Sequence, residues 1–171
     1  FKFSYIIPRI VIHMRYKTGH VAPKWDISVF NDVAWCAQPF NDSSQYSRWV
    51  GEGYRKDNTI GVWVDITSRE FPEVLKETFG AWQGLNDIGL TVYKMSTSEI
   101  LPVHFDTYNY YKKIFKLNST KVDIFRTIVL LDDWSSGHYL EVDNNPVVKW
   151  KAGDWYMWAR SEEHTSELQS H

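Results

Sequence analysis

Short stretches of alternating apolar and polar residues run along most of the chain, a pattern of period two that predicts β-strands. Aromatic and β-branched residues, which favour strands, are frequent within these stretches. The predicted strands lie at residues 25–30, 60–66, 90–95, 124–131, 139–142, 147–150 and 155–158. The run Ile124–Leu131 gives the strongest of these predictions, and Pro102 favours extended backbone over residues 100–105. Short strands at near-regular spacing are typical of a β-sandwich or barrel.

Three other stretches carry helical signals. Residues 41–44 are expected to form a turn that starts a helix over residues 45–50. Residues 71–79 place apolar side chains at helical spacing, and Pro72 suits a first turn, which predicts a helix packed on the sheet. Residues 108–116 predict a third helix with a basic outer face. The expected fold class is therefore mainly β with flanking helices.

Length, charge and cysteine content narrow the classes of function. The 171 residues, 43% hydrophobic and 23% charged, suit one globular domain. A formal net charge of −2 gives no overall attraction to nucleic acid or to an anionic membrane. The apolar run Tyr5–Ile12 is broken by Pro8 and Arg9 and is too short to span a bilayer. The single cysteine, Cys36, excludes an internal disulfide and fits a reducing, cytoplasmic compartment.

His104 and Asp106 are the first candidates for chemistry. On an extended segment, side chains two residues apart project to the same face, so this imidazole and this carboxylate are expected to point the same way. A histidine from a later strand would complete a set of two histidines and one carboxylate, which binds Fe(II) and leaves positions open. The pair alone is a weak signal, because six histidines and 21 acidic residues give on the order of one such pair by chance.

The sequence around this pair supplies a context for it. From about Leu90 to Trp158, the chain resembles the core of the Fe(II)/2-oxoglutarate-dependent oxygenases. The nearest branches are the prolyl hydroxylase-like and aspartyl/asparaginyl β-hydroxylase-like enzymes, and small oxygenases of phages and marine bacteria. The matching pieces are, in chain order, Leu101–Asp106, Phe125–Leu131, Asp133–His138 and Val148–Trp158.

The resemblance implies a double-stranded β-helix, the jelly-roll frame that cupins share. It implies that His104 and Asp106 bind Fe(II) with a later histidine, and that 2-oxoglutarate and O2 are the cosubstrates. Arg126 is then expected to hold a 2-oxoglutarate carboxylate, for which a planar guanidinium is suited, and Tyr93 to hydrogen-bond the same molecule. The implied reaction hydroxylates a C–H bond of a small-molecule or peptide substrate.

The last residues carry a different signature. Residues 160–170 read as the in-frame translation of a common short-read sequencing adapter. His164 falls where the family places its later ligand histidine, yet it lies within this stretch, so we expect it to occupy that position by coincidence. The β-helix is then expected to be incomplete at its C-terminus. We divide the chain into a ragged N-terminal segment, an oxygenase-like domain, the core of that domain and an adapter-derived tail, at residues 1–24, 25–159, 88–159 and 160–171.

Other interpretations of the same residues stay open. A non-catalytic jelly-roll binding module, or a phage structural domain, would carry His104 and Asp106 as surface residues at a strand end. A zinc or other hydrolytic metal site is a third interpretation. Arg126 can instead pair with a neighbouring aspartate at a strand edge, and Tyr93 can line the core. Iron titration separates the first two interpretations, because a binding module takes up no stoichiometric Fe(II).

Overall fold

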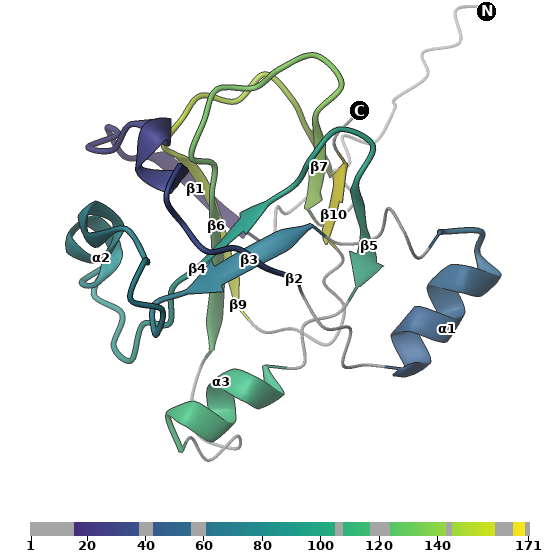
Figure 1. Ribbon diagram of the computed structural model, residues 1–171, viewed down its shortest axis with the longest axis horizontal. Coiled ribbons are helices and arrows are strands. Elements are labelled where there is room, and N and C mark those ends of the chain that lie inside the picture. Colours follow the sequence, from purple (N-terminus) through teal and green to yellow (C-terminus); the bar gives the residue numbers. More distant parts are fainter. Residues whose placement is uncertain are drawn as a thin grey trace, which may run out of the picture.

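The computed structural model describes residues 16–37, 43–55, 61–104, 108–116, 124–142, 145–159 and 166–169. In these residues short strands predominate and the helices are few and brief (Figure 1). The strands are β1 (Tyr16–His20), β2 (Cys36–Ala37), β3 (Val62–Asp65), β4 (Thr91–Lys94), β5 (Ile100–His104), β6 (Phe125–Val129), β7 (Tyr139–Val142), β8 (Asn145–Val147), β9 (Asp154–Ala159) and β10 (Ser166–Gln169). The helices are the 3-10 helix η1 (Ile27–Phe30) and the α-helices α1 (Ser43–Gly51), α2 (Glu73–Phe79) and α3 (Asn109–Ile114).

The strands form three small antiparallel sheets. Sheet A has the order β1-β9-β6, sheet B the order β2-β3-β4, and sheet C the order β5-β10-β7-β8. Within the described residues each sheet is open, and none is closed on itself or curled. The prediction of a mainly β fold with short helices is confirmed at this level.

One apolar cluster joins sheets A and B to helix α2, and we call it the α2 cluster. Its buried members are Trp25, Val33, Val64, Phe71, Leu75, Phe79 and Val92, with Val129 of β6 packed against them. Val64 and Val92 lie opposite each other in β3 and β4, so α2 covers that face of sheet B. Burial of a side chain such as Leu75 stabilises the fold by roughly 1.5–3 kcal/mol.

A second apolar cluster lies between sheets A and C, and we call it the β7 cluster. Its buried members are Leu140, Val142, Val147, Trp150 and Trp158, with Tyr16, Ile128, Leu130, Trp134 and Tyr156 packed against them. Ile128 and Val129 are consecutive in β6 and belong to different clusters, so sheet A presents one face to each cluster. Figure 1 agrees, with α2 on the left, the labelled strands of sheet C on the right, and sheets A and B between them.

Most of the elements predicted from the sequence are confirmed. The predicted helices at residues 45–50, 71–79 and 108–116 correspond to α1, α2 and α3. The predicted strands at residues 60–66, 90–95, 124–131, 139–142 and 155–158 correspond to β3, β4, β6, β7 and β9, and the extended residues before position 105 form β5.

The strand predicted over residues 25–30 is wrong. Residues Ile27–Phe30 form the helix η1, because the Asp26 carboxylate accepts a hydrogen bond from the Ser28 N–H at 2.9 Å and caps that turn. Trp25 is buried, but Ile27 is 54% exposed, so the apolar alternation of this stretch does not build one buried face.

The strand predicted over residues 147–150 is displaced toward the N-terminus. Strand β8 spans Asn145–Val147, and Lys149 has φ 59°, in the left-handed region, which takes the chain out of strand conformation. A positive φ at a lysine has no signature in the sequence, because the residues that favour it are glycine and asparagine.

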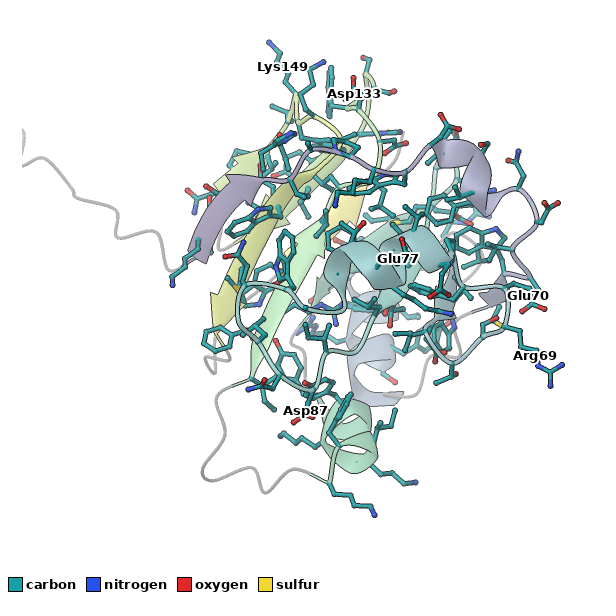
Figure 2. The ribbon with its side chains drawn as sticks, turned by 90° about the vertical axis from the view of Figure 1, so that its left-hand side faces the viewer. Arg69, Glu70, Glu77, Asp87, Asp133 and Lys149 are labelled. Carbon is teal, nitrogen blue, oxygen red and sulfur yellow. The ribbon has the colours of Figure 1, made fainter. Side chains whose placement is uncertain are left out.

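Residues 16–20, within the segment for which the sequence predicted no element, form β1. This strand pairs with β9 from Tyr16 opposite Trp158 to His20 opposite Asp154 (Figure 2). Gly19 lies against the Trp155 ring, and a Cβ at this glycine would come within 2.4 Å of it. Residues 16–20 therefore form a strand because they pair with the edge of β9, although their own sequence pattern is weak.

Candidate functional site

His104 is the last residue of β5, at one end of sheet C. Its side chain, and the whole of Asp106 and His164, lie outside the described residues. Among the residues that are described, no three histidine, cysteine, aspartate or glutamate side chains gather as a metal site. The predicted iron ligands therefore stay predictions.

The strand register nevertheless places His104 on one face of sheet C. His104 lies opposite Ser166 of β10, and Ser166 lies opposite Val142 of β7. Val142 is a buried member of the β7 cluster. Pro102, two residues before His104, is also fully buried. A shift of register separates this pair from the rest of the β5–β10 ladder, which is typical of a β-bulge.

Arg126 lies on the face of sheet A that carries the β7 cluster. It follows Phe125 in β6 and lies opposite Trp158, and Ile128 comes two residues later on the same face. The Arg126 side chain is partly buried. The predicted cosubstrate residue is therefore on one of the two sheet faces between which the β7 cluster packs.

Tyr93 of β4 lies on the face of sheet B that is turned away from α2. Its neighbour Val92 belongs to the α2 cluster, so Tyr93 alternates to the opposite face, where it lies across from Trp63 of β3. The Tyr93 side chain is 38% exposed. Tyr93 thus lies at the surface and does not line the core, and its contact to a cosubstrate stays a prediction.

Trp63 of β3 has a feature that the sequence analysis did not predict. Its indole N–H is buried and has no hydrogen-bond partner in the described part of the chain. The alternation Val62-Trp63-Val64 was a signal for the face on which Trp63 lies. The missing acceptor, in contrast, is visible only in three dimensions.

The Gly153-Asp154 turn, which belongs to the segment Val148–Trp158 of the oxygenase-like pattern, is held by several side-chain hydrogen bonds. Asp154 accepts hydrogen bonds from the Lys151 N–H and from His20 Nδ1, both at 2.9 Å. Asp133 accepts from the Ala152 N–H at 2.9 Å and from the Lys151 ammonium at 3.3 Å. Figure 2 shows Asp133 and Lys149 at the same end of the molecule. These two aspartates hold the turn that leads into β9.

His138 and Trp150 belong to the same end of the fold. Their rings stack, with centroids 6.2 Å apart and an interplanar angle of 18°, and Trp134 donates its indole N–H to the His138 carbonyl at 2.7 Å. The half-buried His138 is thus held by aromatic packing.

The contribution of Asp133 to the stability of the Gly153-Asp154 turn is expected to depend on pH. Hydrogen bonds from the Ala152 N–H and then the Lys151 ammonium hold the pKa of Asp133 below its ordinary value. A lowered folded-state pKa adds stability that is present above the unfolded pKa and is lost as the pH falls through the folded one. In thermal melts between about pH 5 and pH 2, Asp133→Asn is expected to lose less stability than the wild type. Asp132→Asn, at the exposed neighbouring residue, should follow the wild type, and identical pH profiles for all three proteins would contradict this origin.

Comparison of the chain with protein-family models, curated proteins and solved structures found no match. No described helix is long and apolar enough to cross a membrane, since the longest, α1, has 9 residues. The likeness to the oxygenases therefore rests on the motifs and on the positions given above.

Proposed function

We propose that this protein is an Fe(II)- and 2-oxoglutarate-dependent dioxygenase built on a double-stranded β-helix. The observation that carries the proposal is the order in which the chain visits two facing sheets. Strand β5 lies in sheet C, β6 in sheet A, the β7–β8 hairpin in sheet C and β9 in sheet A. Strand β10, which joins β5 to β7 in sheet C, lies in the stretch that reads as adapter translation. The β7 cluster packs between these sheets. Such alternation between two packed sheets is typical of a jelly roll, and it supports the proposal.

The register of sheet C supports the assignment of the metal ligands. His104 lies opposite Ser166 in an antiparallel pair. In sequence, Asp106 follows His104 by two residues and His164 precedes Ser166 by two. Residues that leave one strand and enter its antiparallel partner do so at the same end of the pair. His104, the last residue of β5, therefore lies at the end of the β5–β10 pair from which the chain continues toward Asp106.

The donor set fits ferrous iron. Two imidazoles and one carboxylate are the ligands of non-haem Fe(II) oxygenases, and they leave positions open. We assign His104 and Asp106 to the ligand set of the protein itself, because His164 lies in the stretch that reads as adapter translation. When bound, iron with 2-oxoglutarate and O2 supplies the oxidising power for hydroxylation, coupled to decarboxylation of the cosubstrate to succinate.

The residues of the chain bind and orient the reactants. Arg126 is partly buried in β6, on the face of sheet A that carries the β7 cluster, and a guanidinium can hold a carboxylate through two parallel hydrogen bonds. Tyr93 offers a hydroxyl on the face of sheet B turned away from α2. Leu140 and Val142, both buried in β7, belong to the apolar cluster that packs between sheets A and C.

Anaerobic addition of Fe(II) and 2-oxoglutarate tests the proposal. We expect a weak metal-to-ligand absorption band that appears only when both components are present and saturates at one iron per chain. Addition of Fe(II) alone, or with succinate in place of 2-oxoglutarate, should give no band. A folded protein, judged by circular dichroism, that takes up no stoichiometric Fe(II) would instead support a non-catalytic binding module.

The role of Arg126 is tested in the same titration. Arg126→Gln is expected to raise the 2-oxoglutarate concentration at half-saturation by about 10- to 100-fold, because a charge-assisted carboxylate contact is lost. Its affinity for Fe(II) alone should not change. Arg69→Gln, at an exposed residue near α2 (Figure 2), is the matched control and should titrate like the wild type. Equal half-saturation in all three proteins would remove Arg126 from the site.

A further inference from the structure

Strand β4 (Thr91–Lys94) is one margin of sheet B, because the strands of that sheet have the order β2-β3-β4. The Ile66 N–H donates to the Leu90 carbonyl at 3.0 Å, and these two residues continue the register of the β3–β4 ladder. Bonded and non-bonded pairs alternate along an antiparallel ladder. Every second residue after Leu90 therefore bonds to β3, whereas the N–H and C=O groups of Thr91 and Tyr93 point away from it.

The outward main-chain groups of Thr91 and Tyr93 lie at an open margin. Within the described part of the chain no strand pairs with this side of β4, and both side chains are exposed, Tyr93 at 38%. A strand margin with free donors and acceptors is a template for another extended segment. Strand β4 thus offers two N–H donors and two C=O acceptors in one row.

Several other sheet margins carry features that discourage such pairing. Pro102 lies in β5 and Pro146 in β8, the two margins of sheet C, and proline has no N–H to donate. Strand β2, the other margin of sheet B, has only two residues, and β1 exposes Lys17. Strand β4 is four residues long and contains no proline.

The one charged residue of β4, Lys94, is directed away from the open margin. Its ammonium lies over the Trp35 ring, 5.7 Å from the centroid. Trp35 directly precedes β2, which pairs with β3 on the side opposite β4. The ammonium therefore reaches back over sheet B. It does not guard the outer side of β4, where a lysine would repel a second strand.

We infer that two copies of this chain associate by pairing their β4 strands antiparallel, about a two-fold axis through Val92. A second copy fits this margin because β4 is complementary to itself. Thr91 of one copy lies opposite Tyr93 of the other, a favourable pair of a β-branched and an aromatic residue. Each of the two symmetric Thr91–Tyr93 pairs exchanges two main-chain hydrogen bonds. Lys94 falls opposite Leu90, so no like charges meet. The inference does not depend on the proposed function.

Sedimentation equilibrium of the full chain tests the inference with two proline variants. Thr91→Pro removes an N–H that points away from β3, so the β3–β4 ladder keeps its hydrogen bonds. Thr18→Pro is the matched control. The Val21 N–H bonds to the Gly153 carbonyl in the register of the β1–β9 ladder, so by the same alternation the Thr18 N–H points away from β9.

We expect the wild type and Thr18→Pro to dimerise alike. Thr91→Pro should raise the dissociation constant of the dimer by at least about 10-fold, because two hydrogen bonds are lost per dimer. A wild type that is monomeric at about 1 mM overturns the inference. A dimer that folded Thr91→Pro leaves unchanged, or that both variants weaken equally, places the contact elsewhere and also overturns it.

An extended peptide is the other possible occupant of this margin. A synthetic peptide with the sequence of residues 89–95 is therefore added to the wild type at concentrations where the protein is monomeric. If the wild type never dimerises and yet binds this peptide, with binding lost in Thr91→Pro, the margin takes a peptide strand and not a second copy. That result overturns the inference.

A second measurement keeps the inference testable if Thr91→Pro does not fold. Thr91→Cys and Tyr93→Cys are prepared as separate chains, each with Cys36→Ser so that it carries one thiol. Directly opposed, hydrogen-bonded residues lie about 5.5 Å apart between Cα atoms, within the range of a disulfide. We expect oxidation of the mixture to link the two different chains faster than it links either chain to itself. Equal rates in the mixture and in the separate solutions would overturn the register and the inference with it.

Discussion

Replacement of His104 by alanine will reduce the affinity for Fe(II) by at least about 100-fold and abolish the absorption band with 2-oxoglutarate. The expected loss is at least as large as the 10- to 100-fold effect of altering groups that only support a metal ligand. His104 contributes its backbone to the β5–β10 pair opposite Ser166, and alanine keeps that backbone. The unfolding temperature should therefore change little while metal binding is lost.

His138→Ala is the matched control for His104→Ala. The His138 ring stacks on Trp150 and belongs to the end of the fold that carries the Gly153-Asp154 turn. Its removal should lower stability slightly and leave Fe(II) affinity unchanged. An Fe(II) affinity of His104→Ala within about twofold of the wild type would contradict the metal assignment, since a lost ligand costs far more.

Gly153→Ala is expected to destabilise the fold by about 3–5 kcal/mol, one of the largest effects open to a single methyl group. Gly153 has φ 92°, a backbone conformation that residues other than glycine rarely adopt. A Cβ built there lies 2.0 Å from the Val21 carbonyl oxygen, which belongs to the backbone. The Gly153 carbonyl also accepts the Val21 N–H at 3.0 Å, so relief of the clash breaks the junction of β1 and β9.

Chemical denaturation of Gly153→Ala and Gly51→Ala measures this effect with its control. Gly51 ends helix α1, and a Cβ built there meets nothing within 4 Å. Alanine is a better helix former than glycine, so Gly51→Ala should be neutral or slightly stabilising. A free energy of unfolding for Gly153→Ala within about 1 kcal/mol of the wild type would show that the turn relaxes without cost.

The local elements of this fold follow from its apolar patterning wherever burial and periodicity agree. Leu75 and Phe79 are buried at helical spacing in α2, and Leu140 and Val142 are buried at strand spacing in β7. The apolar face of α2 packs into the α2 cluster, and the apolar face of β7 packs into the β7 cluster. Periodicity then decides the conformation, and the prediction from sequence is confirmed.

The predictions fail where a single polar contact or backbone torsion decides the conformation. The Asp26 carboxylate turns residues 27–30 into η1 despite their alternating pattern. The positive φ of Lys149 ends a strand that the composition of Val147–Trp150 favours. Both effects depend on the position of one atom or one torsion, which an average over several residues does not register.

The candidate site was predictable to a similar extent. Tyr93 and Arg126 could be named from the sequence, and alternation in their strands was enough to set which neighbours share their faces. The sequence could not predict that sheets A and B pack against the same helix. That arrangement follows from Val129 of sheet A packing against the cluster that contains the buried residues of α2. Trp63 was missed because an unpaired donor is defined by atoms that are far away in sequence.

The position of β1 bears on how the molecule behaves in concentrated solution. This strand covers one long edge of β9, and in the described residues its own outer edge is the margin of sheet A. Lys17 and Thr18 are exposed on it, and a charged, five-residue margin is a poor template for a second copy of the chain. Resistance to aggregation therefore depends on β1, which lies outside the candidate site. A fusion joint or label placed ahead of Tyr16 should leave β1 intact.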